Sequence, residues 1–218
     1  MLTPKRIETP ELLDEHDAPA ADVARSLRDL RFFNRWCGGI PIYRRLLRRL
    51  GGGTKSVLDV GTGTSDLLES LGGGFRVGLD FKIEHLLNGD GAGIRRVAGD
   101  ALRLPFRDGA VDVVTSSHFF HHFTPQENAA ILAESLRVAR HGVAAIDTRR
   151  HYAPLLFVRL LAGLRLVGRI TRFDAPASVL RGYTTGEARA VAAKSGAPRA
   201  EVVQAFPFRF GILLWKRL

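Results

Sequence analysis

The chain has 218 residues, of which 45% are hydrophobic and 25% are charged, as in ordinary globular domains. This composition excludes a collagen-like or disordered chain, and the length predicts a single domain with a core large enough to support a cleft. The 32 Lys and Arg residues outnumber the 22 Asp and Glu residues, giving a net charge of +10, which favours polyanionic or membrane-surface partners.

One cysteine, Cys37, cannot form an internal disulfide, and no cluster of Cys and His has the spacing of a zinc site. The first residues lack the apolar segment of a signal peptide. The longest apolar stretch, 154–168, is interrupted by arginine and is too short to span a bilayer. The sequence therefore predicts a cytoplasmic protein with no metal site, and at most a peripheral membrane contact.

In chain order, the first twenty or so residues are acidic and rich in proline and predict an arm. Apolar residues at helical spacing predict a helix over 21–36, and a second helix begins at Pro41 and ends at Leu50. Short apolar runs then alternate with helical stretches. The predicted strands are 56–60, 75–80, 94–100, 111–117 and 142–147, and the clearer helices between them are 65–71 and 125–139.

The alternation stops after residue 147. The sequence there predicts an apolar and basic helix over 152–170, a helix over 184–195 that opens with a capping box from Thr184 to Glu187, and a terminal hairpin of 200–206 and 210–216. Strands alternating with helices indicate an α/β fold. We expect a doubly wound, Rossmann-like, mostly parallel seven-stranded sheet with an antiparallel terminal strand.

Carboxylates follow three of these strands, at the edge where such sheets bind ligands. Asp59 precedes the turn Gly61-Thr62-Gly63, and Asp80 and Asp100 end the next two strands. A dinucleotide fingerprint needs a further glycine where Asp66 stands, no Walker loop is present, and Asp59 would repel a pyrophosphate. The three carboxylates together fit a nucleoside with an ammonium group and no phosphate, which describes S-adenosylmethionine.

The segments VLDVGTGTSDL, GLD, GDALRLPF and DVVTSSHFFHHF resemble the class I S-adenosylmethionine-dependent methyltransferases, and most closely the ubiquinone/menaquinone-type group. The resemblance covers about residues 57–147, with Ser65 replacing the usual third glycine and Arg140-His141-Gly142 replacing Pro-Gly-Gly. It implies S-adenosylmethionine as cofactor and S-adenosylhomocysteine as product. The cofactor-binding residues that it implies are Asp59, Gly61, Thr62, Gly63, Asp80, Phe81, Asp100, Ala101, Ser116 and Ser117.

This resemblance divides the single methyltransferase domain, 1–218, into four parts. We expect an N-terminal arm and helical cap over 1–53, a cofactor-binding core over 54–148, a helical insert or lid over 149–198 and a terminal β-hairpin over 199–218.

Methyl transfer needs positioning more than covalent help, although a base assists an acceptor that must lose a proton. The candidate bases are three histidines just past the fourth strand. His118 is the first choice, because the family more often has an apolar residue there. His121 and His122 belong to a pattern shared by relatives with different substrates, so packing is the better interpretation for them.

The insert is where this fold usually builds its acceptor pocket, although its apolar helix also fits a lid packed on the sheet. RFFNRWCGG, ARHGVAAID and SVLRGYT resemble a subgroup of bacterial methyltransferases encoded among polyketide genes. That likeness implies a phenol of polyketide or quinone type. The predicted acceptor-side residues are Arg31, Asn34, Arg35, Asp147, Arg150, Tyr152, Asp174 and Tyr183.

Three functions compete. The first is methyl transfer to a small aromatic or lipophilic hydroxyl, and the second is methylation of RNA, which the net charge favours but no nucleic-acid motif supports. The third is a non-catalytic cofactor-binding partner subunit. The methylated atom (O, C or N) and the oligomeric state stay open. Basic residues gather outside 56–148, so we expect them to frame the acceptor site and to suit an anionic phenolate or an anionic membrane.

Overall fold

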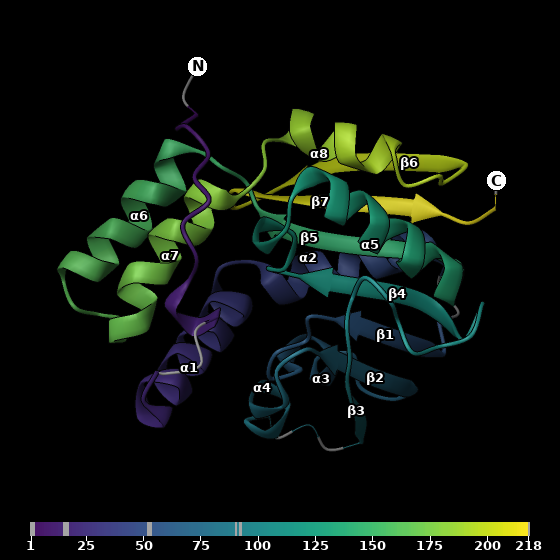
Figure 1. Cartoon of the computed structure of the whole chain (residues 1–218), viewed down its shortest axis with the longest axis horizontal. Helices are drawn as coiled ribbons and strands as arrows, with labels where there is room; N and C mark the ends of the chain where they lie inside the picture. The colour runs from purple at the N-terminus through teal and green to yellow at the C-terminus, as the bar shows by residue number, and fades with distance from the viewer. Residues whose placement is uncertain (1–2, 15–17, 52–53, 90, 92, 218) are drawn as a thin grey trace.

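The computed structural model describes residues 3–14, 18–51, 54–89, 91 and 93–217, whose arrangement is shown in Figure 1. Within them lies one seven-stranded sheet with the order β3-β2-β1-β4-β5-β7-β6. Its strands are β1 (Ser56–Val60), β2 (Phe75–Asp80), β3 (Ile94–Ala98), β4 (Val111–Ser117), β5 (Ala139–Thr148), β6 (Arg199–Ala205) and β7 (Arg209–Trp215).

Strands β1 to β5 are parallel, whereas β7 runs antiparallel to both of its neighbours, β5 and β6. The predicted fold is confirmed. Every residue of β1 and β4 is buried, which explains why these strands appear in the sequence as short, mainly apolar runs. The strand order reverses between β1 and β4, and this switch point is where such sheets bind ligands.

Helices cover both faces of the sheet. On one face, α2 (Gly39–Leu50) packs on β5 and β7 and contacts α3 (Asp66–Glu69). On the other, α5 (Pro125–Val138) packs on β4 and β5, and α8 (Thr185–Ala193) packs on β6 and β7. Alternate residues of β5 enter the two cores: Ala145 packs with the residues of α5, and Ala144 packs with Tyr43 of α2. The short α4 (Ile83–Leu87) contacts β2 and β3.

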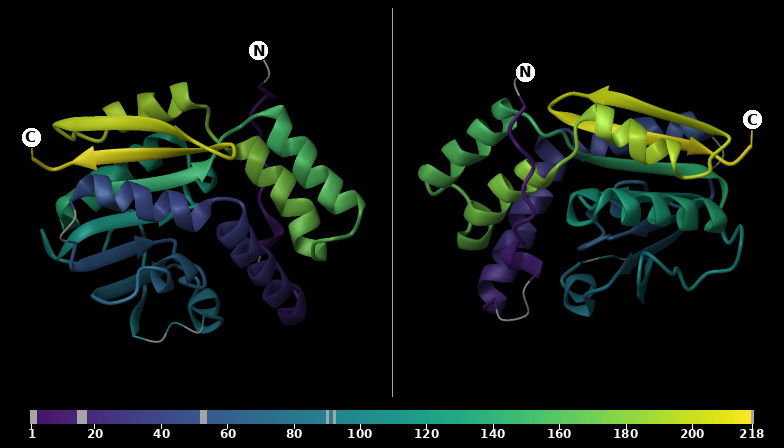
Figure 2. Two further views of the ribbon diagram at one scale, coloured as in Figure 1. Left: turned by 180° about the vertical axis from the view of Figure 1, so that it is seen from behind. Right: turned by 45° about the horizontal axis from the view of Figure 1, so that its top comes forward.

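A separate group of helices stands off one end of the sheet (Figure 2). It contains α1 (Ala20–Trp36), α6 (Tyr152–Gly163) and α7 (Arg169–Arg181), with α7 in contact with both of the others. Two short 3₁₀ turns, η1 (Leu12–Asp14) and η2 (Phe120–His122), lie against α7. This group supplies the cover over the carboxyl ends of the strands.

The predicted helix over 152–170 is wrong in its extent, because the structure divides this region into α6 and α7. The turn between them passes through Arg165, whose φ of +55° is incompatible with a continuing helix. Helix α7 then extends to Arg181, through a stretch for which the sequence predicts no helix. The capping box at the start of α8 is confirmed, since Thr184 and Glu187 bond to each other's backbone.

The arm runs along α7. The Ile7 N–H donates to the Leu180 carbonyl at 3.4 Å, and the Arg6 guanidinium donates to the Arg181 carbonyl at 2.9 Å. Further along, the N–H groups of Leu12 and Leu13 donate to the Asp174 carboxylate at 2.8 and 2.9 Å. These bonds carry the arm from the far end of α7 to the carboxyl ends of the strands. None of the described helices has the length and apolar character needed to cross a bilayer.

Candidate active site

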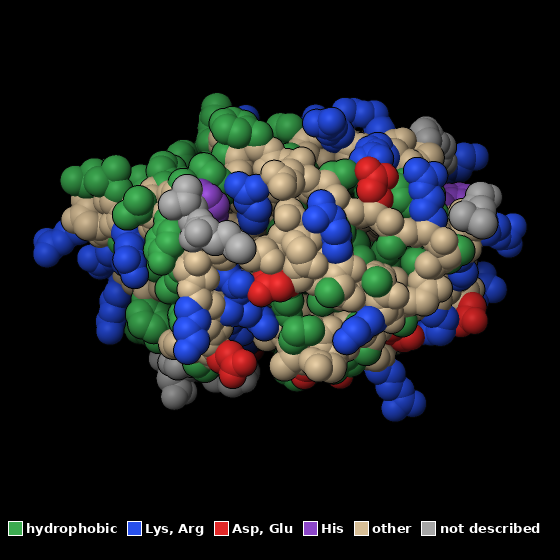
Figure 3. Space-filling model, turned by 90° about the horizontal axis from the view of Figure 1, so that it is seen from above, with side chains coloured by type: hydrophobic (Ala, Val, Ile, Leu, Met, Phe, Trp, Pro, Cys, Tyr) green, Lys and Arg blue, Asp and Glu red, His purple; other side chains and the backbone are tan. Residues whose placement is uncertain are grey.

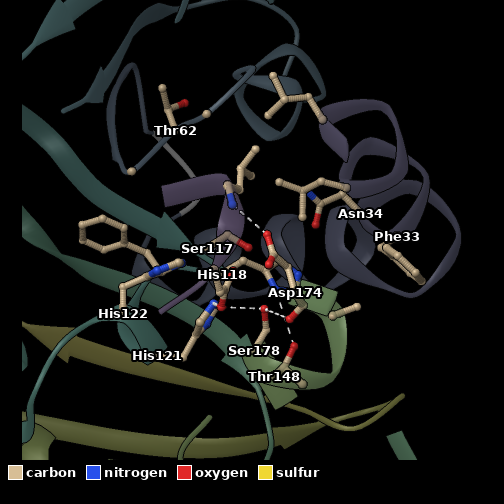
Figure 4. Close-up of a pocket in the computed structure, with 18 of the residues that line it drawn as sticks. Phe33, Asn34, Thr62, Ser117, His118, His121, His122, Thr148, Asp174 and Ser178 are labelled. Atoms are coloured by element: carbon tan, nitrogen blue, oxygen red, sulfur yellow. Dashed lines mark hydrogen bonds and ion pairs between the residues drawn. The ribbon is translucent and has the colours of Figure 1, made fainter. Parts of the chain in front are cut away.

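A cavity of about 830 Å³ opens at the carboxyl ends of β1, β2 and β4, within the range of small-molecule sites. Its floor includes the turn after β1 and the ends of β2 and β4. Its walls come from α1, α6 and α7, and residues of the arm and the start of β7 complete it. In Figure 4, His121, Asp174 and Ser178 lie close together, whereas Thr62 of the turn lies apart from them.

The turn after β1 brings backbone to the cavity. Gly61 has a φ of +67°, and a Cβ built there would overlap the Phe119 ring, so this position requires glycine. The Gly61 and Thr62 N–H groups donate to the Leu79 carbonyl at 2.8 and 3.0 Å, which ties the turn to β2. Gly63 has a φ of +53°, and a Cβ there would meet no atom within 4 Å, so the cavity comes directly to its backbone.

Three carboxylates gather on this side of the cavity. Burial raises the pKa of Asp59 to about 6, and the nearby carboxylates of Asp66 and Asp80 also raise it. The Thr115 hydroxyl, which donates to Asp59 at 2.6 Å, acts in the opposite direction and lowers this pKa. Burial also raises the pKa of Asp66, although Asn34 donates to its carboxylate at 3.1 Å. A buried cluster of one sign is unfavourable alone and is stabilised by a cation, as the ammonium and sulfonium of S-adenosylmethionine would provide.

Asp80 is held ready to accept further bonds. Its carboxylate accepts from the N–H groups of Gly63 at 2.9 Å and Lys82 at 3.0 Å. Burial raises its pKa, but His85 and these bonds outweigh burial and leave the pKa below its usual value. The free lone pairs suit vicinal ribose hydroxyls. The Ser117 hydroxyl also lines the cavity, buried and without a hydrogen-bond partner among the described residues, so it too fits a polar ligand.

A buried carboxylate–imidazole–carboxylate chain crosses from the arm to β5. His121 Nδ1 lies 2.8 Å from Asp147 Oδ1, and His121 Nε2 lies 3.3 Å from Glu11 Oε1. Burial opposes protonation of the imidazole, but Asp147 and Glu11 outweigh it and raise the pKa of His121 to about 10. Burial raises the pKa of Asp147, but its pairing with His121 outweighs burial and lowers this pKa to about 2. At neutral pH, His121 is therefore a cation between two anions, which suits a positioning role.

His122 lies beside this chain, with its Nδ1 2.9 Å from Asp14 Oδ2. Glu11, His121 and His122 could each bring one ligand atom to a shared metal ion. Both ring nitrogens of His121 face carboxylates, those of Asp147 and Glu11.

His118 follows β4 with a φ of +52°, which turns its ring toward the start of β7. Its Nε2 contacts the Arg209 guanidinium, and its Nδ1 lies 3.4 Å from the Thr148 hydroxyl. Burial and the charge of Arg209 hold the pKa of His118 well below its usual value. The ring is therefore neutral, and the lone pair of Nε2 points at a cation.

The covering helices add apolar side chains to the lining of the cavity. They are Leu27 and Phe33 of α1, Phe157 and Val158 of α6, and Val179 of α7. An aromatic or aliphatic ligand would lose water on contact with these side chains.

Most of the residues predicted for the cofactor line the cavity. They are Asp59, Gly61, Thr62, Gly63, Asp80, Phe81, Asp100, Ala101 and Ser117. Ser116 does not line it, because side chains alternate along β4 and Ser117 takes the cavity side. Of the acceptor-side residues, Asn34 and Asp174 line the cavity, and so do the three histidines.

Three predicted acceptor-side arginines lie outside the cavity lining. Arg31 pairs with Glu69 at 3.3 Å on the side of α3, and Arg35 is exposed on the outer face of α1. Arg150 is buried but donates to Glu187 at 2.7 Å, which fixes the start of α8.

Asp147, Tyr152 and Tyr183 also lie outside the lining. Asp147 sits beneath His121, and its carboxylate is bonded to the ring and the backbone N–H of that residue. Tyr152 is exposed at the first turn of α6. Tyr183 is buried under η2, where its hydroxyl donates to the Phe123 carbonyl at 2.7 Å. These side chains are of types common in functional sites, but in this fold they lie outside the cavity.

Several residues that line the cavity were not predicted from the sequence, among them Glu11, Asp14, Asp66, Ser178 and Arg209. Asp66 had a usable signal, since it follows the glycine turn directly. The others come from the arm, from α7 and from β7, and no spacing in the sequence relates them to the strand ends.

Comparison with known proteins agrees with this geometry. Residues 58–146 match the family described as a methyltransferase domain. Demethylmenaquinone methyltransferase of Roseiflexus castenholzii is 41% identical over 109 residues, covering 45% of this chain and 45% of that protein. The chain thus matches less than half the length of this curated relative.

Solved structures show the same fold over more of the chain. A SAM-dependent methyltransferase from Aquifex aeolicus superposes with a TM-score of 0.63 at 20% identity, covering 89% of this chain and 98% of that one. Human N-acetylserotonin methyltransferase, solved in complex with SAM, gives 0.59 at 13% identity, covering 98% of this chain and 63% of that one. The chain is therefore similar in sequence to methyltransferase domains over residues 58–146, and it has the fold of these S-adenosylmethionine-dependent methyltransferase structures.

Proposed function

We propose that the protein transfers a methyl group from S-adenosylmethionine to a hydroxyl of a small aromatic or lipophilic acceptor. The observation that carries this proposal is a cavity of about 830 Å³ that is lined both by the carboxylates at the strand ends and by apolar side chains of α1, α6 and α7. The acidic part of the lining suits a cationic nucleoside, and the apolar side chains suit a flat or lipophilic acceptor. The relative from R. castenholzii, a demethylmenaquinone methyltransferase, supports a quinone-like acceptor.

When bound, S-adenosylmethionine supplies an electrophilic methyl group that the acceptor oxygen takes by in-line displacement. Asp80 would accept hydrogen bonds from the ribose hydroxyls, and Asp59 with Asp66 would stabilise the positive charge. Phe33, Phe157 and Val179 exclude water around the acceptor, which strengthens every electrostatic interaction in the cavity. Orientation in a dry cavity is the main contribution that such a transfer requires.

Methylation of RNA is less well supported, because the arm and α7 line the cavity and apolar side chains of α1, α6 and α7 form part of its lining. A non-catalytic partner subunit is also less well supported, because the carboxylates at the strand ends are retained and line the cavity.

We also propose that α6 rests on an anionic lipid surface. Leu156, Leu160 and Leu164 repeat at four-residue spacing and are 64%, 59% and 60% exposed. Residues 152–173 contain four arginines and no acidic residue, so this face complements an anionic bilayer. In Figure 3, hydrophobic side chains gather at the end where Figure 1 places α6, with Lys and Arg side chains beside them. Phe157 and Val158 of the same helix line the cavity, which would give a lipophilic acceptor a short path.

The test is transfer of labelled methyl from S-adenosylmethionine to a cell extract that has been split into lipid, small polar and RNA fractions. We expect label in the lipid or aromatic fraction, and none with Asp80→Ala. Asp108→Ala is the matched control, because Asp108 is exposed on a loop outside the cavity. Label in the RNA fraction alone, or normal transfer by Asp80→Ala, would refute the proposal.

A further inference from the structure

Arg209, the first residue of β7, is a buried cation in the wall of the cavity. It is 4% exposed. Its Nε donates to the Cys37 carbonyl at 3.2 Å, one Nη donates to the Phe33 carbonyl at 3.4 Å, and the other meets His118 Nε2. All of these partners are neutral. Burial lowers the pKa of Arg209 to about 10, which still leaves the guanidinium charged at neutral pH.

The other buried arginines differ from it. Arg150 lies 2.7 Å from the Glu187 carboxylate, and Arg181 lies 4.0 Å from that of Asp14. Among the described residues, no carboxylate lies within ion-pair distance of Arg209. The nearby Asp147 is committed to His121.

A buried charge without a counter-ion is costly, and proteins usually supply the missing partner. The guanidinium has five N–H groups, of which three are used here, and the residue lines the cavity. The two carbonyls it contacts belong to the C-terminal end of α1, so one function of Arg209 is to cap that helix. Capping uses two of the donors and leaves the charge available to a ligand.

We propose that Arg209 binds the acceptor as an oxyanion, so that the acceptor class is an acidic hydroxyl, a phenol or an enol, that enters the cavity ionised. This inference rests on the proposed function for the identity of the ligand, but the anion site itself does not. Phe33 and Phe157, which line the same cavity as Arg209, would contact the ring of such an acceptor, and Arg209 would hold its oxygen.

The reaction then needs no base from the protein. The acceptor gives its proton to bulk water when it binds, and its oxygen forms the bond to the methyl carbon while the bond from that carbon to sulfur breaks. The anionic oxygen becomes a neutral ether, and the cationic sulfur becomes the neutral thioether of S-adenosylhomocysteine. In this scheme His118 is a positioning residue, since its neutral ring orients the guanidinium instead of taking a proton.

The groups that act on Arg209 come from several elements. His118 follows β4 and contacts it, Asp147 lies on β5, Cys37 ends α1 and Asp66 begins α3. Asp147 and Asp66 are anionic when ionised and Cys37 is a thiol in this range, so none of them lowers the pKa of an acceptor. Arg209 supplies the positive charge that lowers the pKa of the acceptor.

The experiment uses 4-nitrophenol as the probe, because its ionised form absorbs visible light and its binding can be read without turnover. With wild-type protein and S-adenosylhomocysteine present, we expect the apparent pKa of bound nitrophenol to fall by about one unit, a tenfold shift toward phenolate. Arg209→Met should abolish this shift, and Arg209→Lys should retain part of it. Arg45→Met, an exposed arginine of α2, is the matched control and should behave as wild type.

If the wild-type protein binds neutral nitrophenol, or if folded Arg209→Met still lowers its pKa, the proposal is wrong. If Arg209→Met does not fold, as loss of the helix cap alone would allow, the wild-type titration and Arg209→Lys still decide. A lowered pKa without labelled methyl transfer would leave the anion site standing and refute the proposed function. Methyl transfer without a lowered pKa would support the proposed function and refute the anion site at Arg209.

Discussion

The contact between Glu11 and His121 gives a sharp prediction about how the arm is held. In Glu11→Gln the arm loses the carboxylate that lies 3.3 Å from His121 Nε2. Removing one member of a fully buried ion pair costs about 3–5 kcal/mol. Here Asp147 still neutralises His121, and glutamine can still accept a bond from it. The loss is therefore that of one charge-assisted hydrogen bond, and we expect about 2 kcal/mol of unfolding free energy.

Urea unfolding followed by circular dichroism measures this loss. With a slope of about 2 kcal/mol per molar, the midpoint of Glu11→Gln should fall by roughly 1 M. Glu8→Gln makes the same substitution at an exposed position of the same arm and should stay within about 0.5 kcal/mol of wild type. Equal midpoints for Glu11→Gln and Glu8→Gln would show that the chain from the arm to β5 contributes no stability.

The same difference should depend on pH. The folded pKa of His121 is raised from 6.5 to about 10, so its contribution is complete below 6.5 and is lost as the pH rises through 10. The pKa of Glu11 is lowered from 4.5, so its contribution is present above 4.5 and is lost at lower pH. We therefore expect the largest difference between wild type and Glu11→Gln near pH 5–6.5. A difference that grew above pH 10 would contradict an ion pair.

Three further changes test other parts of the site. Because burial raises the pKa of Asp59 to about 6, affinity for S-adenosylmethionine should fall by up to about tenfold per pH unit below 6. Calorimetry should show that this pH dependence disappears in Asp59→Asn. A pH dependence that persists in this variant would show that Asp59 is not the titrating group. Gly61→Ala forces a Cβ into the Phe119 ring at a φ of +67° and should weaken cofactor binding at least tenfold; unchanged affinity would show that the turn is not rigid. Leu160→Glu should reduce co-sedimentation with anionic vesicles several-fold, whereas Leu87→Glu, at an even more exposed position on α4, should not. Equal binding by both variants would place the lipid surface elsewhere, and self-association of the wild type that is lost only in Leu160→Glu would assign α6 to contact with a second copy.

The sheet and its cofactor half were predictable because their signals are local. Buried parallel strands read as apolar runs, and the turn after β1 needs glycine for reasons of backbone conformation and contact with Phe119. The carboxylates Asp59 and Asp80 follow their strands directly in the sequence. Nothing beyond a window of a few residues is needed to find them.

The acceptor half was not predictable in this way, because it is assembled from distant segments. The break between α6 and α7 depends on a left-handed residue, Arg165, that carries no glycine signal. Glu11 and Arg209 reach the cavity from opposite ends of the chain. Arg150 and Tyr183 have the chemistry of site residues, yet Glu187 and the Phe123 carbonyl engage them elsewhere.

The cavity is lined partly by the core of the fold and partly by flanking segments, and this division has a consequence for how the protein can evolve. The family match spans 58–146, and the lining residues that we propose for the acceptor lie largely outside it, on the arm, α1, α6, α7 and the start of β7. Under the proposed function, mutations in those flanking segments would change which acceptor is methylated while the carboxylates at the strand ends stay intact. A chimaera that joins the flanks of this chain to the core of a relative should therefore carry over acceptor preference, and evolution can exchange substrates here without rebuilding the chemistry.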